Sequence, residues 1–217
     1  MSTIEKKTLN IQFRQLVDVN HPDFQAALDI YNEAFPIAER SSVARVKQIV
    51  QNNWEQMYLG YLGDRVVFLG ILYELEGTDF VLLSYIATEK NYRNQGIGSQ
   101  FIEQLLVELK FQKKYLLLEV KTPKGESDKV SWRRIAFYRR LGAKELKGVN
   151  YFVPALSGNT PTESILMILP EYHQPTLAGA FVKQLIYKLY VEGYDRPDTD
   201  PLLLQLLAGV GDRVELV

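Results

Sequence analysis

Apolar and polar positions in the N-terminal part of the chain follow two different periods. Some stretches alternate or are continuously apolar, which is typical of strands, and others repeat apolar residues at helical spacing. This pattern predicts strands over Leu9–Val17, Met57–Leu62, Arg65–Leu75 and Phe80–Thr88, and helices over Phe24–Phe35 and Ser42–Gln51. Phe80–Thr88 is apolar at nearly every position, so we expect a strand that is covered on both faces.

The remaining chain adds a strand-helix-strand unit and a long C-terminal segment. Ile97–Phe111 is an expected helix, and Tyr115–Val120 is the strand after it. The crossover predicts that this strand is parallel to Phe80–Thr88. The later expected elements are a helix over Trp132–Leu141, strands near Lys144–Val153 and Ser164–Ile168, and helices over Pro175–Tyr194 and Pro201–Ala208. The pattern as a whole indicates a mixed α/β sheet.

Composition narrows the class of protein. With 217 residues and 47% hydrophobic content, the chain can bury the core of one sizeable domain. Lys plus Arg (25) almost cancels Asp plus Glu (26), so no strong net field attracts nucleic acid or an anionic membrane. No cysteine is present, which removes disulfides and thiolate chemistry. Without a signal-like or membrane-spanning apolar run, we expect a cytoplasmic protein.

The stretch Arg93-Asn94-Gln95-Gly96-Ile97-Gly98 lies between a predicted buried strand and a predicted helix. Its glycines let backbone amides approach a ligand, and the helix N-terminus favours an anion. A P-loop would need a lysine before Ser99. A dinucleotide fingerprint would need a glycine at Phe101 and would follow the first strand, whereas this turn follows the fourth. A pyrophosphate cradle and a glycine turn without a ligand both remain open at this point.

Two further strings change this balance, namely Tyr85-Ile86-Ala87-Thr88 before the turn and Phe137-Tyr138-Arg139-Arg140-Leu141-Gly142-Ala143 well after it. Together with Tyr92–Gly98, they resemble the GNAT superfamily of N-acetyltransferases over roughly Leu9–Ile168. The resemblance implies a mostly antiparallel sheet with helices on both faces, a GNAT domain over residues 1–170 and a helical extension over 171–217. It also implies acetyl-CoA as co-substrate.

By this resemblance, the turn holds the CoA pyrophosphate and the end of the strand before it pairs with pantetheine. The implied cofactor-binding residues are Ile86, Ala87, Thr88, Arg93, Asn94, Gln95, Gly96, Ile97, Gly98, Ser99 and Ser131. The sequence departs from the family at two positions. Ser131 stands where many members have asparagine, and Arg134 stands where many have alanine.

Acetyl transfer to an amine needs a proton acceptor and a group that serves the departing thiolate. Tyr138 is the expected general acid, because a phenol keeps its proton at neutral pH; core packing beside Phe137 is the structural alternative. For the base, Glu39 lies in a loop that often shapes the family's acceptor pocket, and Glu119 lies inside an apolar strand where desolvation would raise its pKa. Alternatively, either glutamate is an ordinary solvated carboxylate, and a chain of water molecules carries the proton away without a dedicated base.

The resulting hypothesis is direct attack of a primary amine on acetyl-CoA. Its rival is a non-catalytic acyl-CoA-binding module of the same fold. His21 and His173 lack ligand spacing, so we expect no metal site. The arginines of the helix that carries Tyr138 are interpreted as a solvated face, and no nucleic-acid or membrane partner is expected. The C-terminal segment serves as a lid or as a homodimer contact, and the acceptor stays open.

Overall fold

The computed structural model describes residues 9–51 and 55–217. The described residues form two compact units, one of residues 9–51, 55–72 and 85–108, the other of residues 73–84 and 109–217. Three elements contribute to both units, namely strands β3 (Arg65–Glu74) and β4 (Phe80–Thr88) and helix α3 (Ile97–Gln112).

The first unit packs helices against both faces of its strands. Its other elements are β1 (Gln12–Leu16), α1 (Asp23–Ala34), the 3-10 turn η1 (Ile37–Glu39), α2 (Val43–Gln51), β2 (Glu55–Leu62) and the 3-10 turn η2 (Lys90–Tyr92). The buried residues of α1 and α2 form one core cluster with Leu59, Leu69 and Ile71. In a separate ring cluster, Phe101 of α3 packs against Phe13 and Phe68.

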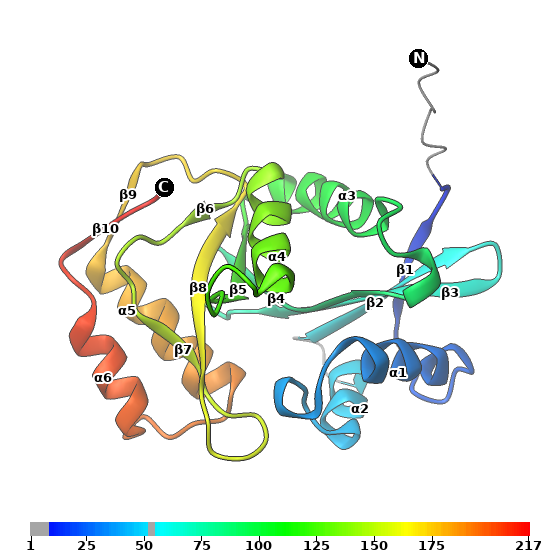
Figure 1. Cartoon of the computed structure of the whole chain (residues 1–217), viewed down its shortest axis with the longest axis horizontal. Helices are drawn as coiled ribbons and strands as arrows, with labels where there is room; N and C mark the ends of the chain where they lie inside the picture. The colour runs from blue at the N-terminus through cyan, green and yellow to red at the C-terminus, as the bar shows by residue number, and fades with distance from the viewer. Residues whose placement is uncertain (1–8, 52–54) are drawn as a thin grey trace. The chain divides into compact units, whose positions relative to one another are not determined.

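The second unit contains the longer run of elements. They are β5 (Tyr115–Lys121), α4 (Lys129–Arg140), β6 (Lys144–Glu145), β7 (Tyr151–Val153), β8 (Thr162–Leu169), β9 (Thr176–Ala178), α5 (Gly179–Lys188), the π-helical turn η3 (Leu189–Gly193), α6 (Pro201–Gly209) and β10 (Arg213–Glu215). Strand β5 pairs in parallel with the start of β4 and antiparallel with β8. Figure 1 shows α5 and α6 on one side of β8 and α4 on the other.

Side-chain alternation along β5 separates two environments in this unit. Successive residues of a strand point to opposite faces, so Leu117 and Glu119 share one face. Leu117 belongs to a core cluster with Leu185 of α5 and Leu203 of α6. The C-terminal segment therefore covers the face of β5 that carries Glu119.

Strand order confirms the expected mixed α/β fold. Hydrogen-bonded neighbours follow the order β1-β2-β3-β4-β5-β8-β6, and β7 also pairs with β8. Apart from β4 with β5, the pairs with an assigned register are antiparallel. The predicted strand Phe80–Thr88 has the bounds that the sequence indicated, and its parallel pairing with β5 is confirmed.

The helix predicted from Pro175 is wrong at its start. The sequence indicated a helix from Pro175 to Tyr194, but Thr176–Ala178 is strand β9, which pairs with β10, and α5 begins only at Gly179. The Gly179 amide donates to the Asp212 carbonyl at 2.7 Å. A Cβ at Gly179 would lie 1.8 Å from the Gly211 carbonyl oxygen, so this close approach of two backbones requires glycine.

Candidate functional site

The glycine turn combines left-handed backbone with the start of a buried helix. Asn94 has φ 62° and Gly96 has φ 83°, values that glycine adopts without strain and asparagine tolerates. Ile97 is buried at the first position of α3, whereas Arg93 to Gly96 are exposed. The turn is therefore open to solvent while the helix behind it is fixed in the core.

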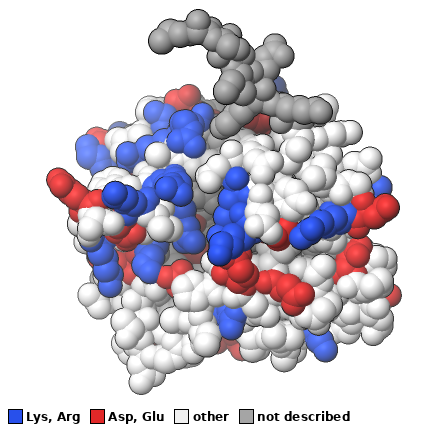
Figure 2. Space-filling view, turned by 45° about the vertical axis from the view of Figure 1, so that its right-hand side comes forward, with Lys and Arg blue, Asp and Glu red and all other residues white. Residues whose placement is uncertain are grey.

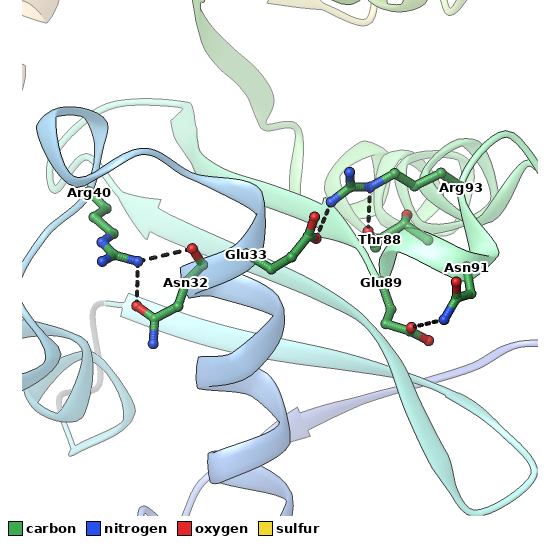
Figure 3. Close-up of polar contacts among 7 residues, drawn as sticks. All are labelled: Asn32, Glu33, Arg40, Thr88, Glu89, Asn91 and Arg93. Atoms are coloured by element: carbon green, nitrogen blue, oxygen red, sulfur yellow. Dashed lines mark hydrogen bonds and ion pairs between the residues drawn. The ribbon is translucent and has the colours of Figure 1, made fainter.

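Side-chain contacts hold the turn against its own unit (Figure 3). The Arg93 guanidinium donates through Nε to the Thr88 carbonyl at 3.0 Å and forms an ion pair with Glu33 of α1. The Asn91 amide donates to Glu89 at 2.9 Å, and the Glu89 amide donates to the Val67 carbonyl at 2.9 Å. These bonds connect the turn to α1, to the end of β4 and to β3.

The backbone of the turn presents donors suited to an anion. The Gln100 amide donates to the Gly96 carbonyl at 3.0 Å, the first bond of the α3 ladder. The amides of Ile97, Gly98 and Ser99 therefore have no partner within the helix. A Cβ at Gly96 would meet no protein atom within 4 Å, so the space beside this residue is open. Amides, helix dipole and open space together fit a pyrophosphate group.

The three predicted pantetheine-binding residues lie at the end of β4. Strand β4 pairs with β5 at Phe80, Val81 and Leu82, and Ile86–Thr88 lie beyond that paired stretch. Ala87 is buried, and its two neighbours are half-buried. A strand end of this kind can accept an extended ligand by backbone hydrogen bonding. The structure thus brings Ile86–Thr88 and Arg93–Ser99 together in the first unit.

Glu39 lies in the same unit, in the turn η1 between α1 and α2. The loop is anchored next to it. The Ser41 amide donates to the Tyr31 hydroxyl at 2.8 Å and to the Tyr85 hydroxyl at 3.2 Å. Arg40 donates to the carbonyl and side-chain oxygens of Asn32 at 3.0 and 2.6 Å (Figure 3). Glu39 itself is half-buried.

Tyr138 and Ser131 both lie on α4, in the second unit. Tyr138 is buried, with its ring centroid 5.1 Å from that of Phe137. Burial raises the pKa of Tyr138 to about 12, against the opposing effect of the Arg134 charge. Ser131 is also buried, and both its amide and its hydroxyl donate to Asp128, at 3.1 and 2.9 Å. Asp128 is thus the N-cap of α4, which begins at Lys129 and not at the predicted Trp132.

Glu119 is held by two tyrosines that the sequence pattern did not point out. The hydroxyl of Tyr151 on β7 donates to its Oε1 atom, and the hydroxyl of Tyr194 after η3 donates to its Oε2 atom. Burial raises the pKa of Glu119, and the two hydroxyl donors act in the opposite direction. The rise expected from its place in an apolar strand is confirmed. Tyr138 is not brought to this face, because α4 lies on the other side of β8 (Figure 1).

Surface charge, metal-binding side chains and helix hydrophobicity were compared with the needs of other kinds of site. Figure 2 shows lysines and arginines interspersed with acidic residues on the face that it presents. Within residues 9–51 and 55–217, no cluster of histidine and acidic side chains has the size that a metal site needs. No helix in the same part of the chain is long and apolar enough to cross a bilayer.

Comparison with known proteins identifies the domain that contains the glycine turn. Residues 53–142 match the family model described as Acetyltransferase (GNAT) domain. Residues 53–142 are thus similar to a GNAT acetyltransferase domain. The matched residues include the end of β4, the turn Arg93–Ser99 and Tyr138 on α4. The predicted resemblance to the GNAT family is confirmed for these residues, and the GNAT family uses acetyl-CoA.

Individual proteins are similar to this chain in sequence or in fold. YjbC of Bacillus subtilis (strain 168), provisionally named an acetyltransferase, is 30% identical over 128 residues, which span 59% of this chain and 62% of YjbC. A GNAT-family protein of Bacteroides thetaiotaomicron superposes with a TM-score of 0.72 over 86% of this chain and 99% of its own, at 20% identity. The ribosomal-protein-S18-alanine N-acetyltransferase of Escherichia coli has a TM-score of 0.55 and 25% identity, covering 74% and 94%.

Proposed function

We propose that this protein transfers an acetyl group from acetyl-CoA to a primary amine by direct attack. The observation that carries the proposal is the open turn Arg93–Ser99, whose backbone donors fit a pyrophosphate, inside a segment that matches the GNAT domain. Residues 1–170 would form the acyltransferase domain, with residues 171–217 as its extension. We also propose a cytoplasmic location, because the sequence contains no apolar run long enough to span a membrane.

The geometry of the first unit supports a proposal for the binding residues. Ile97, Gly98 and Ser99 would direct their amides to the pyrophosphate, and Ile86–Thr88 would bond the pantetheine arm through the backbone. Arg93 would serve mainly to position the turn, because its guanidinium is already shared between Glu33 and Thr88. Ser131 is engaged by Asp128, so any contact with the cofactor would compete with that cap.

When bound, acetyl-CoA supplies a reactive thioester carbonyl and a sulfur that departs. Tyr138 would donate its hydroxyl proton toward that sulfur. Its pKa of about 12 keeps the proton in place at neutral pH. An alkyl thiol has a pKa of about 8.5, so complete transfer to a free thiolate would be uphill by roughly 5 kcal/mol. We therefore infer that Tyr138 acts chiefly by hydrogen bonding as the sulfur leaves, and that water supplies the final proton.

A base is needed because a lysine-like ammonium, with a pKa of about 10.4, is almost fully protonated at neutral pH. Glu119 is our first choice, since its raised pKa brings a carboxylate closer to the range of an efficient base. Glu39, which the sequence suggested first, becomes our second choice; its loop is anchored by Ser41 next to α1.

A thiol-reactive dye tests the proposal, because the chain has no cysteine to produce a background signal. Wild-type protein is incubated with acetyl-CoA and with n-butylamine, spermidine, an amino sugar or a peptide that begins with alanine. The peptide is included because one structural relative acts on an alanine of a ribosomal protein. We expect amine-dependent release of CoA. Tight acetyl-CoA binding without release for any amine would instead favour a non-catalytic acyl-CoA-binding module.

A further inference from the structure

Helix α1 supplies a carboxylate that holds the cofactor turn from outside. Glu33, in the last turn of α1, forms an ion pair with the Arg93 guanidinium at the start of the cofactor turn (Figure 3). The same guanidinium donates through Nε to the Thr88 carbonyl at 3.0 Å. Arg93 therefore joins the end of β4 to the turn, and Glu33 holds Arg93 in that position.

The start of the turn depends on such contacts because its backbone is unusual. Asn94 has φ 62° and Gly96 has φ 83°, and both values are left-handed. A residue other than glycine keeps this conformation only where the surrounding structure fixes it. Burial of Ile97 fixes the end of the turn, whereas Arg93, Asn94 and Gly96 are exposed. At the start of the turn, the polar contacts of the Arg93 side chain thus take the place of packing.

Glu33 is also a negative charge beside a site proposed for a polyanion. By charge alone, this carboxylate repels a pyrophosphate, so that its removal should strengthen acetyl-CoA binding. By geometry, its ion pair with Arg93 holds the turn in place, so that its removal should weaken binding. Because the two effects have opposite signs, the direction of the change in affinity shows which of them is larger.

We propose that Glu33 is a positioning residue of the acetyl-CoA site. Through Arg93, it keeps the turn in the shape that presents its backbone amides to the pyrophosphate, and this effect outweighs its repulsion of the ligand. The inference rests on the proposed function and adds a residue to its cofactor side. The side chains of Arg93 and Glu33 are 40% and 41% exposed, so water screens the pair in part. An exposed ion pair supports a change in affinity of roughly 3-fold.

Isothermal titration calorimetry with acetyl-CoA tests the sign of the effect. Glu33→Gln removes the charge and keeps the size of the side chain, and its Kd should be about 3-fold higher than that of the wild type. Asp29→Asn is the matched control, because Asp29 is an exposed carboxylate on the same helix, one turn before Glu33. Its Kd should be unchanged or lower. An unchanged or lower Kd in Glu33→Gln, or an equal rise in Asp29→Asn, would overturn the proposal.

A double variant shows whether Glu33 acts through Arg93. Arg93→Met removes the guanidinium and should weaken binding more than Glu33→Gln does, because the contact with the Thr88 carbonyl is lost as well. In the Arg93→Met background, Glu33→Gln should cause no further loss of affinity, and the relief of repulsion should tighten binding. A further loss of about 3-fold in this background would contradict the proposed role of Glu33.

Hydrogen exchange of the ligand-free protein gives a second readout. The Gln100 amide, which donates to the Gly96 carbonyl, should exchange roughly 3-fold faster in Glu33→Gln than in the wild type and in Asp29→Asn. Equal exchange rates would mean that Glu33 does not hold the turn.

The wild type separates the failure of this inference from that of the proposed function. If the wild type binds acetyl-CoA and Glu33→Gln binds it equally well, only the role of Glu33 is wrong. If the wild type does not bind acetyl-CoA, the proposed function is wrong, and the positioning role is wrong with it. With an amine that supports turnover, Glu33→Gln should raise the KM for acetyl-CoA and leave kcat unchanged, because it removes binding that is uniform along the reaction. A lowered kcat at unchanged KM would contradict the positioning role.

Discussion

Substitution of Gly96 by valine should weaken acetyl-CoA binding strongly while leaving the fold intact. At φ 83°, a side chain at this position is strained, and it would project into the open space beside the turn. Left-handed backbone costs a non-glycine residue about 1–2 kcal/mol. Gly63, in the β2–β3 turn of the same unit, has φ 59° and equally open surroundings, so Gly63→Val is a matched control for strain.

The loss of affinity can be estimated from the hydrogen bonds at stake. A hydrogen bond to a charged group contributes about 1.5–3 kcal/mol, so two displaced amides would weaken binding by at least roughly 100-fold. Acetyl-CoA at about 100 times its Kd stabilises the wild type by about 2.7 kcal/mol. For a chain of this length, that corresponds to a rise in Tm of about 5–11 °C. With 100-fold weaker binding, the same concentration adds about 0.4 kcal/mol, or about 1–2 °C.

Thermal unfolding with and without acetyl-CoA measures both effects in one assay. Gly63→Val and Gly96→Val should lose similar stability without the ligand, because the strain is similar. With the ligand, Gly63→Val should regain the full wild-type rise in Tm, and Gly96→Val should regain almost none. If acetyl-CoA protects Gly96→Val as strongly as Gly63→Val, the pyrophosphate is not held at Arg93–Ser99.

Three further predictions concern the second unit. Tyr138→Phe should lower kcat by roughly 10- to 100-fold at unchanged acetyl-CoA affinity, since it removes one hydrogen bond to the departing sulfur; steady-state kinetics with unaltered kcat would remove that role. Gly179→Ala should destabilise the protein by at least about 1–3 kcal/mol, because the new Cβ would overlap the Gly211 carbonyl. In the control Gly209→Ala, the new Cβ has no atom within 4 Å, so denaturant unfolding should show unchanged or higher stability. The pKa of Glu119 is raised above its ordinary value of 4.5, so the native state binds this proton more tightly than the unfolded state does. The stability of the wild type should therefore fall as pH rises from about 4.5 through the raised pKa. If Glu119→Gln shows the same pH dependence of unfolding as the wild type, this reasoning is wrong.

Periodicity alone predicted most of the elements that position the cofactor turn. Phe80–Thr88 and the start of α3 at Ile97 were predictable because a continuous apolar run and a helical repeat are local signals. Strands β9 and β10 were not. Each is three residues long, and each exists through a partner far away in the sequence. Phe101, which excluded a dinucleotide fingerprint, has its own structural reason, since its ring packs against Phe13 and Phe68.

Individual residues of the candidate site could be predicted from the sequence, but the hydrogen bonds and ion pairs that join them to distant residues could not. Resemblance to family motifs pointed to Arg93 and Tyr138, and the apolar strand around it pointed to Glu119, because these signals are local in sequence. The partner of Arg93, Glu33, is 60 residues away, and Tyr194 is 75 residues from Glu119. Such contacts depend on the tertiary fold, and no single-sequence pattern encodes them. The C-terminal segment, expected as a lid or a dimer contact, thereby supplies a hydrogen bond to a candidate base.

The most direct test of the account follows the acetyl group itself. Wild-type protein, Gly63→Val and Gly96→Val are incubated with isotope-labelled acetyl-CoA and an amine that supports CoA release, and the amine is analysed by mass spectrometry. We predict a labelled N-acetyl amine, formed in proportion to the released CoA, with wild type and Gly63→Val and almost none with Gly96→Val. CoA release that leaves the amine unmodified, or equal labelling by all three proteins, would contradict the central claim.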